Sequence, residues 1–321
     1  MLGKKIETMY RAQLFARYDD TGSVFYFSAA DFEGMRQVPF SFRASAGHRL
    51  QGYFYSYDGY KPGRIVVFDH GMGAGHRAYM KEIEMLARHG YLVFSYDHTG
   101  CMESEGAHTN GFGQSLRDLN DAISALKADP TWGKCEFSVM GHSWGSISTM
   151  NIAALHPDVK HVIGMAGPVS TERILRSMFG KGPMKLFFKR LWKLEQATNG
   201  DFVRYDASET LKNTTAQVLL IYSDNDAIVS RAAHFDVLKA ALDGRDNVRL
   251  LLEHGKGHNP NYTADAVQYK DAFFAELTAK NKAKELETPE QKRAFVEKWD
   301  WDRMTVQDER VWQAVFETLE K

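Results

Sequence analysis

The chain has few cysteines, almost no net charge and no long apolar run, and each absence excludes a class of protein. Only Cys101 and Cys135 occur among 321 residues, too few for a disulfide framework or a four-cysteine zinc site. The formal net charge is −1, so no nucleic-acid or membrane partner is indicated. No apolar stretch is long enough for a signal peptide or a membrane-spanning helix. We expect a cytoplasmic protein with free thiols and no stable membrane insertion.

What the sequence does contain is a regular alternation of short apolar runs and amphipathic segments. Residues 37–43 and 49–55 alternate as antiparallel strands do. Denser apolar runs, typical of strands buried on both faces, follow at 64–70, 91–97, 135–140, 161–166, 218–222 and 248–252. Helical patterns lie between these runs, which predicts an α/β fold with a mostly parallel central sheet and helices on both faces. Ligands of such folds bind beyond the carboxyl ends of the strands.

The alternation divides the chain into five stretches. These are an N-terminal helical extension at 1–36, a core at 37–166 that resumes at 214–287, an insertion at 167–213, and a C-terminal helical tail at 288–321. The insertion interleaves apolar residues with Lys and Arg, has no strand pattern and leaves from a strand's carboxyl end. We predict that it is a small helical cap, the alternative being extra helices packed on the core. The tail is expected to pack on the body and to take no part in chemistry.

The most informative motif is Gly141-His142-Ser143-Trp144-Gly145, which lies between a predicted strand and a predicted helix. A Gly-x-Ser-x-Gly sequence in that setting is typical of a nucleophile elbow, a turn so tight that the serine backbone is strained. The two glycines remove side chains that would collide with the neighbouring elements. The alternative is a serine flanked by glycines in an ordinary loop.

A serine nucleophile needs a base and an orienting acid, and both have candidates in loops after later strands. We favour His258 as base over His254, because Gly255 and Gly257 indicate a loop bent to present the later histidine. We favour Asp226 as acid over Asp224, which lies nearer its strand and resembles a turn residue. The order Ser143, Asp226, His258 is that of α/β-hydrolases.

Two backbone amides are expected to form an oxyanion hole. Trp144 follows the nucleophile, and Met72 lies in the glycine-rich loop at 70–75 after an earlier strand. That loop partly matches a dinucleotide fingerprint, but its third small residue is replaced by His76, so we predict no cofactor. No histidine pair has metal-ligand spacing with a third partner, so no metal is predicted either.

The substrate pocket is predicted from two segments near the motif. His98 follows the second buried strand, and the alternative for its loop is a set of turns stabilised by polar side chains. The insertion supplies Met178, Phe179, Phe187 and Phe188, which we assign to an apolar pocket.

These motifs together resemble the α/β-hydrolase fold family, in particular its monoglyceride lipases, lysophospholipases and serine aminopeptidase-like hydrolases. The resemblance covers about residues 38–280 and is carried by His70-Gly71-Met72-Gly73, by 96–100 with 104–106, by the elbow, by 226–229 and by Gly257-His258. It implies a Ser-His-Asp mechanism without a cofactor, and an eight-stranded sheet with a helical cap. The chain departs from the family at Thr99-Gly100, where an Arg-Gly pair is usual, so no role is carried over for that loop.

We therefore expect a serine hydrolase that cleaves carboxylic esters of small molecules through an acyl-enzyme on Ser143. The alternatives are an acyltransferase or an aminopeptidase on the same three residues, or a hydrolase-fold binding protein without activity. An obvious acidic cluster for a free amino terminus is missing, which favours an esterase over an aminopeptidase. Whether the protein forms a homo-oligomer stays open.

Overall fold

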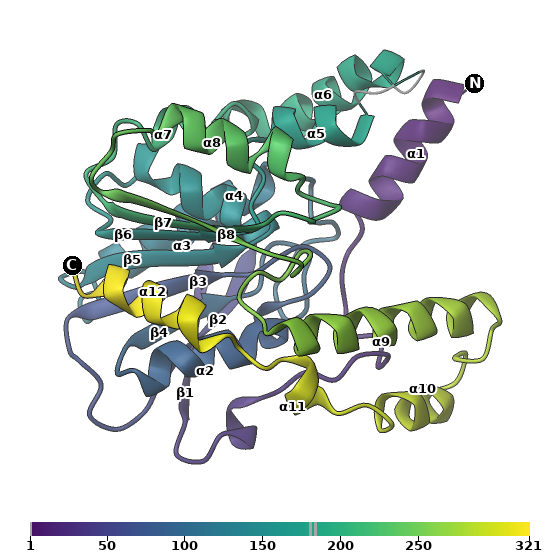
Figure 1. The fold of residues 1–321 in the computed structure, drawn as a ribbon, viewed down its shortest axis with the longest axis horizontal. Helices are drawn as coiled ribbons and strands as arrows, with labels where there is room; N and C mark the ends of the chain where they lie inside the picture. Colours follow the sequence, from purple (N-terminus) through teal and green to yellow (C-terminus); the bar gives the residue numbers. More distant parts are fainter. Residues whose placement is uncertain (1, 180–181, 183–184) are drawn as a thin grey trace.

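A computed structural model describes residues 2–179, 182 and 185–321, so Met1 and four positions of the predicted cap, 180, 181, 183 and 184, lie outside the described residues. An eight-stranded sheet runs through the centre of the molecule in the order β1-β2-β4-β3-β5-β6-β7-β8 (Figure 1). The strands are β1 (Arg36–Arg43), β2 (Arg49–Ser56), β3 (Arg64–Asp69), β4 (Leu92–Tyr96), β5 (Glu136–His142), β6 (His161–Met165), β7 (Gln217–Ser223) and β8 (Val248–Glu253).

The sheet is parallel except around β2, which runs antiparallel to both β1 and β4. All pairings from β4 through β3 to β8 are parallel. The carboxyl ends of β3, β5, β7 and β8 therefore point to the same edge, where the loops with the predicted chemistry begin. The predicted α/β fold with a mostly parallel central sheet is confirmed.

Helices cover both faces because successive strand residues point to opposite sides. In β3, Ile65 and Val67 join the apolar core on one face, and Val66 and Phe68 join the core on the other. The first face is covered by α3 (Gln114–Ala128), α4 (Trp144–Asn151), α7 (Ala207–Thr210) and α8 (Phe235–Ala241). The second is covered by α2 (Met80–Arg88) and α12 (Glu309–Leu319).

Three helices gather at one end of the molecule, namely α1 (Leu2–Leu14), α5 (Thr171–Phe179) and α6 (Lys185–Asn199) (Figure 1). The last two belong to the predicted cap. The buried Tyr10 of α1 donates a hydrogen bond of 2.5 Å to Glu195 of α6. Glu7 and Arg190 form an ion pair of 2.6 Å between the same two helices. The N-terminal helix thus docks on the predicted cap.

The C-terminal part adds α9 (Ala264–Lys282), α10 (Pro289–Val296) and α11 (Trp301–Met304) before α12. These helices enclose a separate apolar cluster around Phe273, Phe295 and Met304. Short 3₁₀ turns complete the fold at Ala29–Asp31, His76–Tyr79, Ile152–Ala154, Gly200–Val203 and Arg231–Ala233. Within the described ranges, none of the helices combines the length and apolar character that crossing a bilayer requires.

Candidate active site

Ser143 occupies the turn between β5 and α4 in a strained conformation. Its φ is 55° and its ψ is −115°, a region that side chains other than glycine rarely adopt. The amide of Ser143 donates to the carbonyl of Met165 in the adjacent β6, at 2.9 Å, which fixes the turn to the sheet. The hydroxyl then stands at the amino end of α4.

Both glycines of the motif are required by space. A Cβ on Gly145 would lie 2.1 Å from the carbonyl oxygen of Asp69, and one on Gly141 would lie 2.6 Å from that of Gly145. Such distances are far below van der Waals contact. The turn therefore packs against β3 because Gly145 lacks a side chain, and β5 packs against the start of α4 because Gly141 lacks one. The strand, strained serine and helix have the features predicted for an elbow.

The structure brings Ser143, His258 and Asp226 into one chain of hydrogen bonds. The Nε2 atom of His258 lies 2.8 Å from Oγ of Ser143. Its Nδ1 atom lies 2.7 Å from Oδ2 of Asp226. With Nδ1 protonated and donating to the carboxylate, Nε2 is left free to accept the serine proton. The three residues lie far apart in sequence and come from loops after β5, β7 and β8.

The Asp226 carboxylate is held by its own loop. Its Oδ1 atom accepts the amides of Ile228 and Val229, at 2.8 and 2.9 Å, while Oδ2 faces His258. The loops after β7 and β8 are joined as well, since Oδ1 of Asn225 accepts the amide of Gly257 at 2.8 Å. The acid and base are thus positioned by backbone hydrogen bonds.

The competing pair, Asp224 and His254, also forms a contact, but no hydrogen bond joins it to Ser143 among the described residues. Its Nδ1–Oδ2 distance is 2.7 Å, and the His254 side chain is 81% exposed. Asp224 accepts the amide of Gly255 at 3.0 Å, as a turn residue does. The geometry therefore favours Asp226 and His258.

The amides of Met72 and Trp144 are the predicted oxyanion donors, and neither has a hydrogen-bond partner in the described part of the chain. Gly71 beside the serine is required by space, since a Cβ on it would clash with the Tyr79 hydroxyl and would also contact Cβ of Ser143 at 3.4 Å. The indole Nε1 of Trp144 donates to the carbonyl of Phe112 at 2.9 Å, which fixes the buried ring. Two unpaired amides beside a nucleophile are suited to bind a developing oxyanion.

Two buried histidines brace these loops. His142 lies with its Nδ1 2.9 Å from the Tyr79 hydroxyl and its Nε2 2.7 Å from the carbonyl of His258. Burial lowers the pKa of His142 well below its usual value, so the neutral ring donates through Nε2 to that carbonyl. Burial likewise lowers the pKa of His70 to about 3. The Nε2 of His70 accepts the His98 amide at 3.0 Å, leaving Nδ1 to donate to the carbonyl of Gly71.

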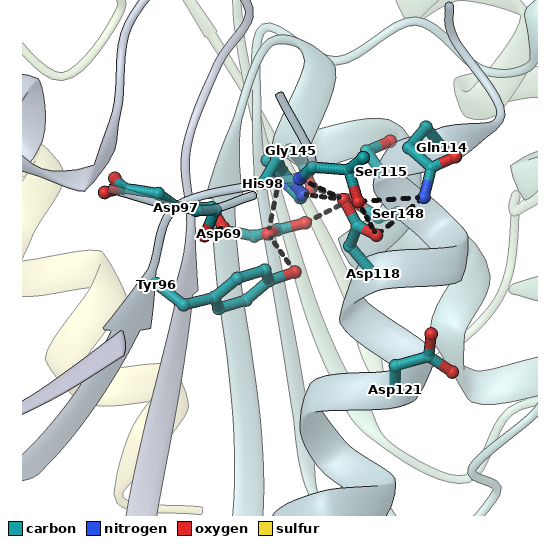
Figure 2. A network of polar contacts seen from close by, with 12 residues as sticks. Asp69, Tyr96, Asp97, His98, Gln114, Ser115, Asp118, Asp121, Gly145 and Ser148 are labelled. Atoms are coloured by element: carbon teal, nitrogen blue, oxygen red, sulfur yellow. Dashed lines mark hydrogen bonds and ion pairs between the residues drawn. The ribbon is translucent and has the colours of Figure 1, made fainter. Parts of the chain in front are cut away.

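The structure corrects the prediction that His98 lies at the pocket. Its ring is fully buried beneath the elbow (Figure 2). Its Nδ1 lies 3.2 Å from Asp118, and its Nε2 lies 2.9 Å from Asp69 without the angle that a hydrogen bond requires. Burial disfavours a charged His98, but the two carboxylates outweigh it and raise its pKa to about 10. Asp118 of α3 and Asp69 of β3 converge on His98 and favour its charged form.

A cavity of about 620 Å³ opens beside Ser143 and His258. That volume lies in the range of small-molecule sites. Its wall is predominantly apolar, and segments from distant parts of the chain contribute to it beside the candidate catalytic loops. These segments include residues 24–27, the loop at 72–74, the α5 residues Ile174 and Met178, and a C-terminal group comprising Tyr262, Lys270, Phe274, Trp301, Met304 and Thr305.

Of the predicted pocket residues, Met178 lines this cavity, whereas Phe179, Phe187 and Phe188 do not. Phe179 packs instead against the Tyr10 ring, with centroids 5.9 Å apart. Phe188 lies 6.4 Å from Trp192 on its own helix and takes the Arg176 guanidinium on its face. Phe187 faces Gly3 of α1. These rings pack between helices. Helical spacing in the sequence does not distinguish a ring in such a contact from a ring that lines a pocket.

The N-terminal extension and the tail also contribute to the cavity wall, which we did not predict from the sequence. Residues 24–27 are four consecutive apolar positions outside any helix, a signal that could have marked them as a docking segment. Trp301 and Met304 belong to the tail that we expected to pack on the body, and they also line the cavity. Over the described residues, no group of three or more His, Cys, Asp or Glu is arranged to hold a metal ion.

Comparison with known proteins agrees with this geometry. The family model described as serine aminopeptidase, S33, matches residues 60–204. The monoglyceride lipase of Rattus norvegicus is 30% identical over 106 residues, and a monoglyceride lipase homolog of Monkeypox virus is 27% identical over 110. An esterase of Pyrococcus furiosus superimposes with a TM-score of 0.58 at 16% identity, covering 86% of this chain and 97% of its own. The chain has the α/β-hydrolase fold, and residues 60–204 are similar to the serine aminopeptidase, S33, family.

The similarity to the curated lipases is confined to part of each protein. The aligned stretches are 32% and 34% of this chain, and 34% and 39% of the rat and viral proteins. The chain thus matches little more than a third of the length of these relatives. The α/β-hydrolase fold is shared along most of the chain with the archaeal esterase.

Proposed function

We propose that this α/β hydrolase is a serine hydrolase that cleaves carboxylic esters of small molecules through an acyl-enzyme on Ser143. The observation that carries the proposal is the hydrogen-bonded chain Ser143–His258–Asp226, with distances of 2.8 and 2.7 Å. The partial similarity to monoglyceride lipases and the fold shared with an esterase support ester cleavage.

In the first half of the reaction, Oγ of Ser143 attacks the ester carbonyl while Nε2 of His258 takes its proton. Asp226 keeps Nδ1 protonated and stabilises the imidazolium that forms. The amides of Met72 and Trp144 hold the tetrahedral oxyanion. His258 then protonates the leaving oxygen, and the alcohol departs, leaving the acyl group on Ser143.

In the second half, water replaces the alcohol and attacks the acyl carbonyl, with His258 taking a proton from it. The same amides hold the second oxyanion, and Ser143 regains its proton as the acid leaves. Neither half requires a metal or a cofactor in this scheme.

The surroundings of the site support a small-molecule substrate with apolar parts. The cavity wall is mostly apolar and aromatic, and Ile174 and Met178 of α5 contribute to it. We propose that α5 and α6 act as the cap over this cavity. The free Cys101 and Cys135 support our proposal of a reducing, cytoplasmic setting.

The test is hydrolysis of p-nitrophenyl esters of graded acyl length by wild type and Ser143→Ala. We expect the variant to lose activity on the order of 10⁴-fold or more while keeping its melting temperature. Retained turnover would remove Ser143 from the mechanism. Aminoacyl p-nitroanilides and competing alcohols in the same assay separate an aminopeptidase or an acyltransferase from an esterase.

A further inference from the structure

A lysine ammonium lines the cavity beside the candidate catalytic residues. Lys270 lies on α9, the first helix after the His258 loop, and its side chain is half-buried. The Nζ atom stands over the ring of the buried Tyr262, 4.9 Å from its centroid. An aromatic face stabilises a cation without satisfying its hydrogen-bonding capacity.

Lys270 has no carboxylate within 4.0 Å and no hydrogen bond among the residues that the structure describes. Buried lysines are normally paired, as Lys256 is with Glu253 and Asp308, each at 2.7 Å. Burial lowers the pKa of Lys270, while the more distant Glu82 and Asp271 act in the opposite sense. A bound anion would restore the stabilisation that the charged form lacks.

Arg77 and His258 also line the cavity, and both side chains already make hydrogen bonds. Arg77 is directed at the main chain, where it donates to the carbonyls of Tyr26 and Phe27, at 3.0 and 3.4 Å. His258 is bonded to Asp226 and Ser143. The exposed Asp271 at the same wall disfavours a doubly charged group. Of the lysine and arginine side chains that line the cavity in the described part of the chain, only Lys270 makes no hydrogen bond, and a single ammonium suits a carboxylate better than a phosphate.

Lys270 lies on the side of the site where the leaving alcohol is expected. Lys270 and His142 both line the cavity that opens beside His258. The His142 ring in turn packs 4.9 Å from that of His258. Since His258 protonates the leaving oxygen, the alcohol part of an ester extends towards His258 and beyond it to α9.

We propose that Lys270 binds a carboxylate on the alcohol part of the substrate, so that the preferred substrates are esters of hydroxy acids with an apolar or aromatic spacer. The inference rests on the proposed ester hydrolysis and names the substrate class for that site. The apolar wall between Ser143 and Lys270 binds the spacer, and the ammonium binds the terminal charge.

The test compares two series of esters. One is the butanoates of ω-hydroxy acids of graded length, and the other is the butanoates of n-alcohols of matching length, with release of butanoate measured by titration. At the best length, we expect wild type to favour the hydroxy-acid ester by about 10- to 100-fold in kcat/KM, the range for a hydrogen bond to a charged group. Lys270→Gln should abolish that ratio and Lys270→Arg should retain most of it.

Lys282→Gln is the matched control, because Lys282 is exposed near the end of the same helix and away from the cavity. It should keep the wild-type ratio. Equal hydrolysis of both series by wild type, or equal effects of Lys270→Gln on both, would overturn the inference and leave the esterase proposal intact.

Calorimetry on Ser143→Ala separates the inference from the esterase proposal. Hydroxy acids should bind more tightly than the matching alcohols, and Lys270→Gln in the same background should remove the difference. If wild type hydrolyses no ester and this difference persists, ester hydrolysis fails while the carboxylate site stands. If the difference is missing, the carboxylate site fails.

Discussion

Two Asp–His pairs lie side by side in the loops after β7 and β8, and only one reaches the serine. Asp224–His254 and Asp226–His258 have the same Nδ1–Oδ2 distance of 2.7 Å. His254 is 81% exposed, whereas the His258 side chain is 20% exposed and contacts Ser143. The pairs therefore provide an internal comparison of a surface contact with a candidate catalytic one.

At the residue scale, Asp226→Asn and Asp224→Asn should behave differently. Asparagine at 226 would stabilise the wrong tautomer of His258, so we expect kcat to fall by roughly 10³- to 10⁴-fold with little loss of stability. Asparagine at 224 should change kcat by less than about threefold, since exposed pairs contribute little. Ester hydrolysis and thermal unfolding of both variants check this, and equal losses would refute the assignment.

Sequence reasoning identified Ser143, Asp226 and His258 because each follows a strand whose end is marked by glycines or acidic turn residues. The structure brings all three together, while their roles remain predictions. His98 also follows a strand, but its environment depends on Asp118, which lies 20 positions later on α3. The sequence around His98 does not indicate that the Asp118 carboxylate contacts it. We therefore predicted a pocket residue where the structure has a buried one.

At the scale of elements, the buried network around His98 ties together β3, α3, α4 and the loop after β4 (Figure 2). Asp69 of β3 also accepts from Tyr96 at 2.8 Å and from Ser148 of α4. Asp118 accepts from Gln114 and from Thr99, at 2.7 and 2.8 Å. Because Gly145 packs on the Asp69 carbonyl, the elbow rests on this network.

The charge of His98 makes the stability of this region sensitive to alkali. Its pKa is about 10 in the fold, against about 6.5 in an unfolded chain. A raised folded pKa adds stability below about pH 6.5, which is lost as pH rises towards 10. Between those limits, the free energy of unfolding should fall by up to about 1.4 kcal/mol per pH unit more in wild type than in His98→Gln.

Urea unfolding of both proteins from pH 6 to pH 10 measures this difference, and the other titrating groups cancel between them. Parallel profiles would mean that His98 is neutral in the fold.

The elements themselves were largely predictable. Dense apolar runs marked five buried strands and the partly buried edge strand β8, and alternation marked β1 and β2, because burial on one or both faces leaves a direct trace in sequence. The tail was less predictable. Its aromatic spacing indicated one or two helices, whereas α10, α11 and α12 form, and α11 faces the cavity. Which surface a short helix covers depends on contacts with distant residues such as Phe25, 5.9 Å from Trp301.

At the scale of the whole molecule, the cavity is a joint product of the core, the predicted cap, the N-terminal extension and the tail. Trp301 and Trp299 allow the role of the tail to be tested. Both rings pack on Phe273, with centroid distances of 4.9 Å for Trp301 and 5.3 Å for Trp299. Of these two residues, only Trp301 lines the cavity.

Trp301→Ala should enlarge the cavity and shift the preference among p-nitrophenyl esters towards longer chains by several-fold in relative kcat/KM. Trp299→Ala should lower stability by a comparable amount, about 1–3 kcal/mol for a partly buried ring, without that shift. Ester profiles and denaturant midpoints of the two variants distinguish the cases. A shift in both, or in neither, would contradict a direct role of Trp301 in the pocket.

The placement of residues 24–27 and 301–305 around one cavity has a consequence for biosynthesis. During translation, Ser143, Asp226 and His258 emerge from the ribosome well before the last wall of the pocket does. A nascent chain could therefore assemble its nucleophile and base yet still lack a closed chamber around them. Formation of the whole chamber therefore requires residues 301–305 to be synthesised and folded against the earlier parts of the chain.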